Sequence, residues 1–301
     1  MLTTAESLES ALRGGALEGR PVLSVPVDGS DDAVFAVECQ GSELLAVWTD
    51  ARSRVVSTGR WPVLATDWGG RGVDGVLLRW HRRRPEITPD SVRADGSRQA
   101  SAAAISWKLS RGGASIERAA NVDYQVRKTQ EVLGWEEASP DVPDWMKRAS
   151  WTFFDHWLFR WELEEFGQSE LARRVEQAHH RPFEWFTPPK AIFLLFLPTA
   201  NGYETPAYLS FFGMEGPAGS ARLIALLRDW ERQFGAELVA HWGTMLQFVV
   251  ARPPADPDEA WDIAWQHDVI ASSLLAQSGI EVRHLAAMLM REKQWFLHER
   301  P

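Results

Sequence analysis

Glutamate and histidine recur in this chain at a spacing that metal-binding helices use. The pattern Glu-x-x-His occurs as Glu176 with His179, and again as Glu281 with His284. Residues three apart share one face of a helix, and two such motifs with two further carboxylates build the di-iron site of a four-helix bundle. Short patterns of common residues also arise by chance. We therefore keep these residues as metal candidates, but expect neither a metal nor another cofactor.

The histidine with the most distinctive setting is His267, near the end of the segment ARPPADPDEAWDIAWQHD (251–268). At about 100° per residue, the apolar side chains of the expected helix gather on one side, and His267 falls among them. Trp261 and Asp268 flank this apolar face. A histidine in an apolar stripe is usually a core residue, and the alternative is a base or a ligand contact. We treat all three residues as binding candidates.

Further binding candidates are dispersed along the chain. His241 and Trp242 stand near the turn of an expected hairpin, where a surface position is the simpler interpretation for the histidine. Tyr203, in the loop ANGYETP, either contacts a ligand or belongs to a solvated loop tip. Trp157 and Trp161 belong to an aromatic helix stripe, which either packs in the core or lines a ligand pocket.

The sequence contains none of the common catalytic motifs. There is no GxxxxGK[ST] or GxGxxG loop, no HExxH and no GxSxG elbow. Cys39 is the single cysteine, which excludes an intramolecular disulfide and a thiolate metal cluster. A catalytic site would therefore have to combine dispersed His, Asp and Glu residues, which need leave no local pattern.

Composition and charge limit the classes of partner. Apolar residues make up 45% of the chain and charged residues 24%, as in an ordinary soluble globular protein. The net charge of −9 repels nucleic acid, and we expect the one basic run, HRRR (81–84), to be a surface loop. The N-terminus lacks the features of a signal peptide, and the longest apolar run, AIFLLFL (191–197), is too short to span a membrane. We expect a cytoplasmic protein without membrane or nucleic-acid partners.

The first third of the chain predicts a small mixed α/β unit over residues 1–83. A capped helix near 4–12 precedes two strands, PVLSVPV and AVFAVEC. A helical pattern over 42–56 then leads to a third strand, WPVLAT. Residues 84–101 show almost no periodicity, so we expect a linker or a long loop there.

The section from 102 to 187 predicts helices rich in tryptophan. Apolar and charged residues alternate at helical spacing over 114–133. Trp151, Phe154, Trp157, Leu158 and Trp161 then recur at spacings of three and four, and the following glycine is a natural helix end.

The section from 188 to 301 predicts an α+β domain with a mixed or antiparallel sheet packed with helices. AIFLLFL and PAYLSFF indicate strands, and the helix ARLIALLRDWERQF ends at Gly235. ELVAHWGTMLQFVVA indicates a hairpin. Asp256 and Pro257 then start the next helix as N-cap and first residue, before the helix VRHLAAMLM and the terminal strand KQWFLHE.

Motifs in this last section resemble a known bacterial family. PTANGYETPAYLSFFG, LLRDWERQFGAELV, a hairpin that ends in RPP and the terminal Trp295-Phe296 are similar to domain-of-unknown-function family 4253, over about 191–297. The segment STGRWPVL (57–64) is similar to one found upstream in such proteins. The chain departs from the family pattern where cysteines are usual and it has GMEGPAG and ASS. The resemblance implies a fold but no activity.

Three classes of function remain open. The first is a non-catalytic interaction protein with a protein partner, for which an acidic surface suits a basic partner, for example in an immunity-type, toxin-neutralising role. The second is an enzyme with a dispersed His/Asp/Glu acid–base site, with or without a metal. The third is a small-molecule sensor that uses the aromatic helices as a pocket. The absence of catalytic motifs favours the first.

Overall fold

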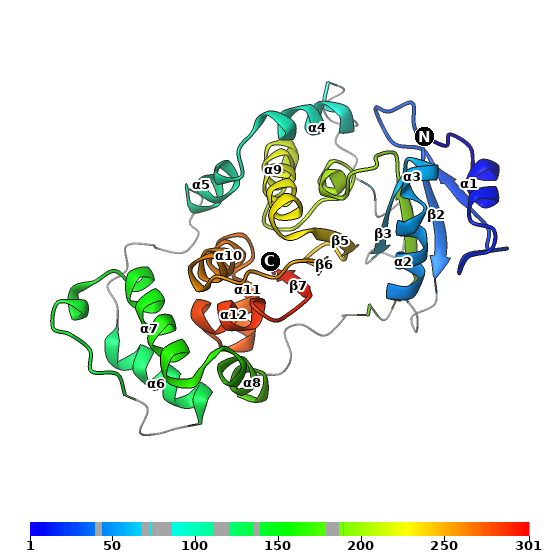
Figure 1. The fold of residues 1–301 in the computed structure, drawn as a ribbon. Coiled ribbons are helices and arrows are strands. Elements are labelled where there is room, and N and C mark those ends of the chain that lie inside the picture. The colour runs from blue at the N-terminus through cyan, green and yellow to red at the C-terminus, as the bar shows by residue number, and fades with distance from the viewer. Residues whose placement is uncertain are drawn as a thin grey trace. The chain divides into compact units, whose positions relative to one another are not determined.

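The computed structural model describes residues 1–39, 44–67, 73, 77, 86–110, 121–134, 139–178, 187–188 and 190–300. By its contacts the chain divides into two units (Figure 1). The first unit combines 1–104, 185–249 and 300–301, and the second combines 105–184 and 250–299. This division falls at other positions than the domain boundaries predicted from the sequence. The basic run at 81–84 lies outside the described residues.

A mixed sheet forms the centre of the first unit, with the strand order β1-β2-β4-β3-β5-β6. β4 is antiparallel to both β2 and β3, whereas β3 is parallel to β5. Leu195 of β4 lies opposite Ala36 on one side and Val63 on the other. All six residues of β4 are buried, as expected of a continuous apolar run between two neighbours. The strands are β1 (Leu23–Val25), β2 (Val34–Cys39), β3 (Trp61–Thr66), β4 (Ile192–Leu197), β5 (Ala236–His241) and β6 (Met245–Val250).

Helices of the first unit pack against these strands and each other. α9 (Gly216–Phe234) contacts β5 and the 3-10 helix η4 (Gly202–Ala207), and α2 (Leu44–Ser53) contacts β3. α9 ends at Gly235, whose φ of 62° is the left-handed conformation predicted for this cap. The other helices that begin in this unit are α1 (Ala5–Ala11), α3 (Val55–Thr58), α4 (Pro89–Arg98) and α5 (Ala102–Ser110), which continues into the second unit.

Two expectations about the first unit are wrong. The stretch 84–101, expected to be a linker or loop, contains α4, which starts with a capping box between Thr88 and Ser91 and packs against α9. The segment PAYLSFF forms no strand. Pro206 cannot donate a ladder hydrogen bond, and the Thr205 hydroxyl donates instead to the carbonyl of Gly202 at 2.8 Å, within η4.

Helices dominate the second unit. α12 (Val282–Leu289) lies at its centre and contacts α7 (Trp151–Phe166), α8 (Gln168–Ala178) and α10 (Pro257–Ile270). α10 begins as predicted, with Asp256 accepting hydrogen bonds from the backbone of Asp258 and Glu259 at 2.9 and 3.1 Å. The remaining elements are α6 (Val122–Leu133), η3 (Met146–Arg148), α11 (Ser273–Ser278) and β7 (Gln294–His298).

The main elements agree with an α+β protein. The predicted first three strands, the hairpin β5–β6, the helix α9 and the terminal strand β7 are confirmed, and the described part of the middle section is mainly helical. Within the described residues, no helix is both long enough and apolar enough to cross a membrane.

Candidate functional site

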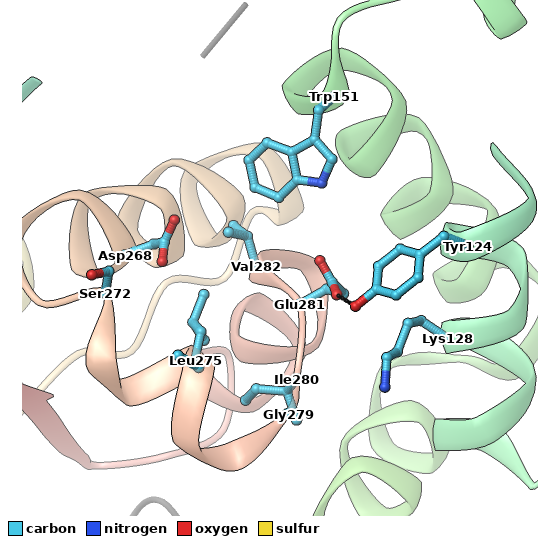
Figure 2. Close-up of a pocket in the computed structure, with 11 residues that line it drawn as sticks. Tyr124, Lys128, Trp151, Asp268, Ser272, Leu275, Gly279, Ile280, Glu281 and Val282 are labelled. Carbon is cyan, nitrogen blue, oxygen red and sulfur yellow. Dashed lines mark hydrogen bonds between the residues drawn. The ribbon is translucent and has the colours of Figure 1, made fainter. Parts of the chain in front are cut away.

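A pocket of about 400 Å³ opens in the second unit between α6, α7, α10 and the α11–α12 connection (Figure 2). Its polar walls carry Tyr124, Lys128, Asp268, Ser272 and Glu281. The apolar side of the pocket is formed by Trp151, Leu275, Ala276, Ile280 and Val282. The volume is within the range of roughly 300–1,000 Å³ that small-molecule sites occupy.

Local helix chemistry positions these side chains. Tyr124 and Lys128 are four residues apart on α6 and therefore share a face, and Trp151 is the first residue of α7, after its N-cap Ser150. α10 ends at Ile270, two residues after Asp268, and α11 begins at Ser273, after the non-helical Ala271 and the N-cap Ser272.

The turn from α11 to α12 brings Glu281 to the pocket. Gly279 ends α11 with φ of 68°, which a residue with a side chain rarely adopts. Glu281 is then the N-cap of α12. Figure 2 shows Tyr124 reaching from α6 to Glu281, and its hydroxyl donates to Oε1 of Glu281 at 3.2 Å. Nε2 of Gln125 donates to the other carboxylate oxygen at 3.3 Å. Both donors are neutral side chains.

Asp268 is the second acid of the pocket. Burial is the main cause that raises the pKa of Asp268 to about 7. The carboxylates of Asp155, Glu281 and Glu299 act in the same direction. Within the described part of the chain, neither a hydrogen bond nor an ion pair satisfies this side chain. Asp268 therefore changes charge near neutral pH.

Lys128 is the one cationic residue among those that line the pocket. Its Nζ forms an ion pair with Glu131 at 2.7 Å and lies 6.0 Å from the centre of the Tyr124 ring. The ion pair holds the lysine at the edge of α6, where Glu131 raises the pKa of the Lys128 ammonium by its hydrogen bond. The direct partner of Lys128 is therefore Glu131, whereas the pocket acid Glu281 acts on it only at longer range.

A buried ion network lies behind the pocket and joins three helices. Arg283 of α12 contacts Asp155 of α7 at 2.6 Å and Glu162 of the same helix at 3.0 Å, and all three side chains have no exposed surface. Arg283 also donates to the backbone carbonyl of Gln125 on α6 at 3.1 Å. Gln125 thus contacts both Arg283 and the pocket residue Glu281. The network fixes the N-terminus of α12 and the pocket-facing side of α6.

Burial acts to raise the pKa of both acids of this network, but the net shift is upward for Asp155 and downward for Glu162. Burial opposes ionisation of Glu162, but the charge of Arg283 and the nearby His284 outweigh it and lower the pKa of Glu162 to about 2. Burial raises the pKa of Asp155, against the opposing effect of Arg283. We regard both as carboxylates, because each accepts a hydrogen bond from the guanidinium group.

His267, Asp268 and Trp261, predicted as one group, have different roles. Only Asp268 lines the pocket. The ring of His267 is buried, lies 5.2 Å from that of Trp295 and is bonded through Nδ1 to the carbonyl of Ile263 at 2.8 Å. Burial lowers the pKa of His267 to about 4. The indole N–H of Trp261 donates to Asp155 at 3.0 Å, so this tryptophan belongs to the buried network.

None of the candidates in the first unit is among the residues that line the pocket. His241 is buried rather than on the surface. Burial lowers its pKa to about 4, and Nδ1 accepts from the backbone of Gly243 at 3.2 Å. Trp242 is buried and donates to Gln247 at 2.6 Å. Tyr203 lies on η4, where burial and then Glu204 raise the pKa of its hydroxyl.

The aromatic stripe of α7 is mainly core. Trp157 and Trp161 are partly buried and pack against a cluster of Met146, Phe154 and Leu158. Trp157 stacks on Phe154 with 5.7 Å between the ring centres. Neither tryptophan lines the pocket, whereas Trp151 from the same stripe does.

Of the two Glu-x-x-His pairs, only Glu281 with His284 lies wholly within the described residues. Glu281 and His284 form the capping box of α12, in which the backbone N–H of Glu281 donates to Nδ1 of His284 at 3.2 Å. The same spacing therefore serves to start a helix. Glu176 is exposed on α8, and His179 lies outside the described residues. Within the described residues, no group of three or more His, Cys, Asp or Glu side chains could hold a metal ion.

The sequence patterns do not single out Tyr124, Gln125, Asp155 or Arg283. One signal was available for Arg283, because a charged residue interrupts the otherwise apolar helix VRHLAAMLM. Asp155 likewise interrupts the aromatic stripe of α7. Tyr124 and Gln125 carry no comparable signal, since their importance comes from contact with Glu281, more than 150 residues away.

Comparison with known proteins supports the sequence resemblance at the C-terminal end. No curated protein and no solved structure matches the chain. The family model that does match covers Asp268, Ser272 and Glu281 but leaves out Tyr124, Lys128 and Trp151, so only one side of the pocket lies in the matched region. That region, residues 193–298, matches the family described as Domain of unknown function (DUF4253), as the sequence motifs predicted.

Proposed function

We propose that this protein is a non-catalytic binding protein and that the pocket of its second unit receives a positively charged group of the ligand. One observation carries the proposal. Asp268 and Glu281 line the same pocket, and within the described residues no lysine or arginine forms an ion pair with either. Carboxylates in such a setting attract cations, and the net charge of −9 favours cationic ligands at longer range. The single cysteine suits a cytoplasmic setting.

Thermal denaturation of the purified chain tests this proposal. Small organic cations, a lysine-rich peptide, and anionic and neutral compounds of similar size are added in turn. We expect a cationic probe to raise the Tm, because a ligand that binds only the folded state stabilises it by about 2.7 kcal/mol at 100 times its Kd. The double variant D268N/E281Q should lose the rise.

A matched control separates the pocket from the general charge of the chain. The variant E259Q/D262N makes the same two changes on exposed positions of α10 and should keep the rise in Tm. The proposal is wrong if no cationic probe raises the Tm, or if D268N/E281Q responds like the parent chain.

A second candidate is an enzyme with Asp268 as general base. The specific observation is the pKa of Asp268 of about 7, because a general base works best when its pKa is near the working pH. The two candidates differ in what happens to the ligand. Long incubation followed by NMR of the ligand should show it unchanged for a binding protein, and a new set of signals for an enzyme.

A further inference from the structure

We propose that the ligand of this pocket is a small aliphatic diamine, with one ammonium group at Asp268, the other at Glu281, and the carbon chain along the apolar wall. The inference rests on the proposed function and narrows it, because that function requires only a positively charged ligand. The inference specifies two positive charges on the ligand, an apolar spacer between them and a size that fits the pocket.

The two carboxylates come from different elements. Asp268 is in the last turn of α10, whereas Glu281 follows the glycine turn that ends α11. Figure 2 shows Val282 between them, with Asp268 beside Ser272 on one side and Glu281 beside Tyr124 on the other. Two separated anionic positions with an apolar side chain between them match a chain that is charged at both ends and apolar in the middle.

Charge in and behind the pocket is unbalanced in favour of anions. Behind it, the single guanidinium of Arg283 is shared between Asp155 and Glu162. At its edge, Lys128 is paired with Glu131. Both cations act on Glu281 at longer range, but within the described residues neither forms an ion pair with Glu281 or Asp268, and a ligand with two positive charges could contact both acids directly.

The walls suit methylene groups and ammonium ions. Leu275, Ile280 and Val282 provide apolar contact for the spacer. The aromatic rings of Tyr124 and Trp151 line the pocket, and a cation is attracted to the face of such a ring within about 6 Å. The volume of about 400 Å³ suits a small molecule that enters whole.

Release of a proton provides independent evidence that a diamine binds beside Asp268. A cation beside Asp268 favours its ionised form and lowers its pKa from about 7, so binding near neutral pH must release a proton. The acids that face Asp268 are Asp155 of α7, Glu281 before α12 and Glu299 after β7. Glu299 is paired with Lys108 at 2.9 Å, and the pKa of the adjacent His267, about 4, keeps that ring neutral. The affinity should therefore fall as the pH is lowered from 8 to 6.

Isothermal titration of the full chain at pH 8 tests the inference with matched probes. They are 1,4-diaminobutane and 1,5-diaminopentane, the monoamine 1-aminopentane, the neutral 1,5-pentanediol and a lysine-rich peptide. We expect a diamine to bind roughly 10- to 100-fold more tightly than the monoamine, because each hydrogen bond to a charged group is worth roughly that factor. The diol should bind more weakly still.

Single variants test whether each of the two carboxylates contacts one ammonium group of the diamine. In D268N or in E281Q, the diamine should bind no more tightly than the monoamine, whereas D262N on the same helix should keep the preference. Titration of the parent chain at pH 7 in two buffers of different ionisation enthalpy should show a released proton, and this readout does not depend on how a variant folds.

The outcomes separate this inference from the proposed function. If the lysine-rich peptide binds and no diamine does, the proposed function is supported and the inference of a diamine ligand is wrong. That inference is also wrong if the diamine binds no better than the monoamine, or if D268N leaves the preference for the diamine intact. If no cationic probe binds, both the inference and the proposed function fall.

Discussion

Replacing Arg283 with methionine tests the central claim about the second unit, that one buried guanidinium holds two buried carboxylates. Methionine fills similar space but removes the one guanidinium group that contacts Asp155 and Glu162, and all three side chains have no exposed surface. Removing one partner of a buried ion pair costs roughly 3–5 kcal/mol. We expect a loss of that size in the free energy of unfolding of R283M.

The pKa of Glu162 leads to a similar magnitude. It is lowered from 4.5 to about 2, and at 1.36 kcal/mol per unit this corresponds to about 3 kcal/mol of stability. Because the folded pKa lies below the unfolded one, this stability is present above pH 4.5 and is lost as the pH falls towards 2. The destabilisation of R283M should therefore be larger at pH 7 than at pH 3.

Urea unfolding followed by tryptophan fluorescence and circular dichroism measures the loss. The matched control is R173M, in which an exposed pair with Glu170 is broken on α8, and it should cost less than about 1 kcal/mol. The triple variant R283M/D155N/E162Q should recover part of the loss, since it removes the unpaired charges as well. A change below about 1 kcal/mol in R283M would refute the reasoning, because it would mean that the carboxylates are not held by the arginine.

Two further predictions concern helix capping and buried histidines. Asp256→Ala removes a side chain that accepts from two backbone groups at the start of α10, so thermal unfolding should show a loss of about 1 kcal/mol, while the neighbouring exposed E259A should cost less. His241 and His267 have pKa values lowered from 6.5 to about 4, so the unfolded chain binds more protons in this range and the unfolding free energy should fall as the pH drops from 6.5 to 4. His267→Gln should make this fall shallower in urea titrations at several pH values, and an unchanged slope would contradict the assignment of a neutral buried ring.

Local chemistry explains why most elements could be predicted from the sequence. Asp256 caps α10 and Gly235 closes α9 through interactions within one turn of the helix. The apolar run of β4 predicts a buried strand even when its neighbouring strands are unknown. Such features depend on neighbouring residues only, and all three were predicted.

The missed helix α4 depends on distant contacts. Its buried residues are Pro89, Val92 and Gly96, too few to produce a helical period. Gly96 is needed because α9 passes so close that an added Cβ would lie 2.7 Å from Ile224. The capping residues Thr88 and Ser91 are visible in the sequence. Apolar periodicity is a stronger indication of a helix, and this segment lacks it.

The pocket could not be read from the sequence because its walls join residues from 124 to 282. The opposite roles of two consecutive residues of α10 are a further reason. His267 and Asp268 differ by about 100° around α10, so one side chain enters the core while the other faces the pocket. Residue type favours the histidine as the reactive group, since its ordinary pKa is nearest to neutral. Burial reverses this order, lowering the pKa of His267 to about 4 and raising that of Asp268 to about 7, so that the aspartate becomes the residue that exchanges protons at neutral pH.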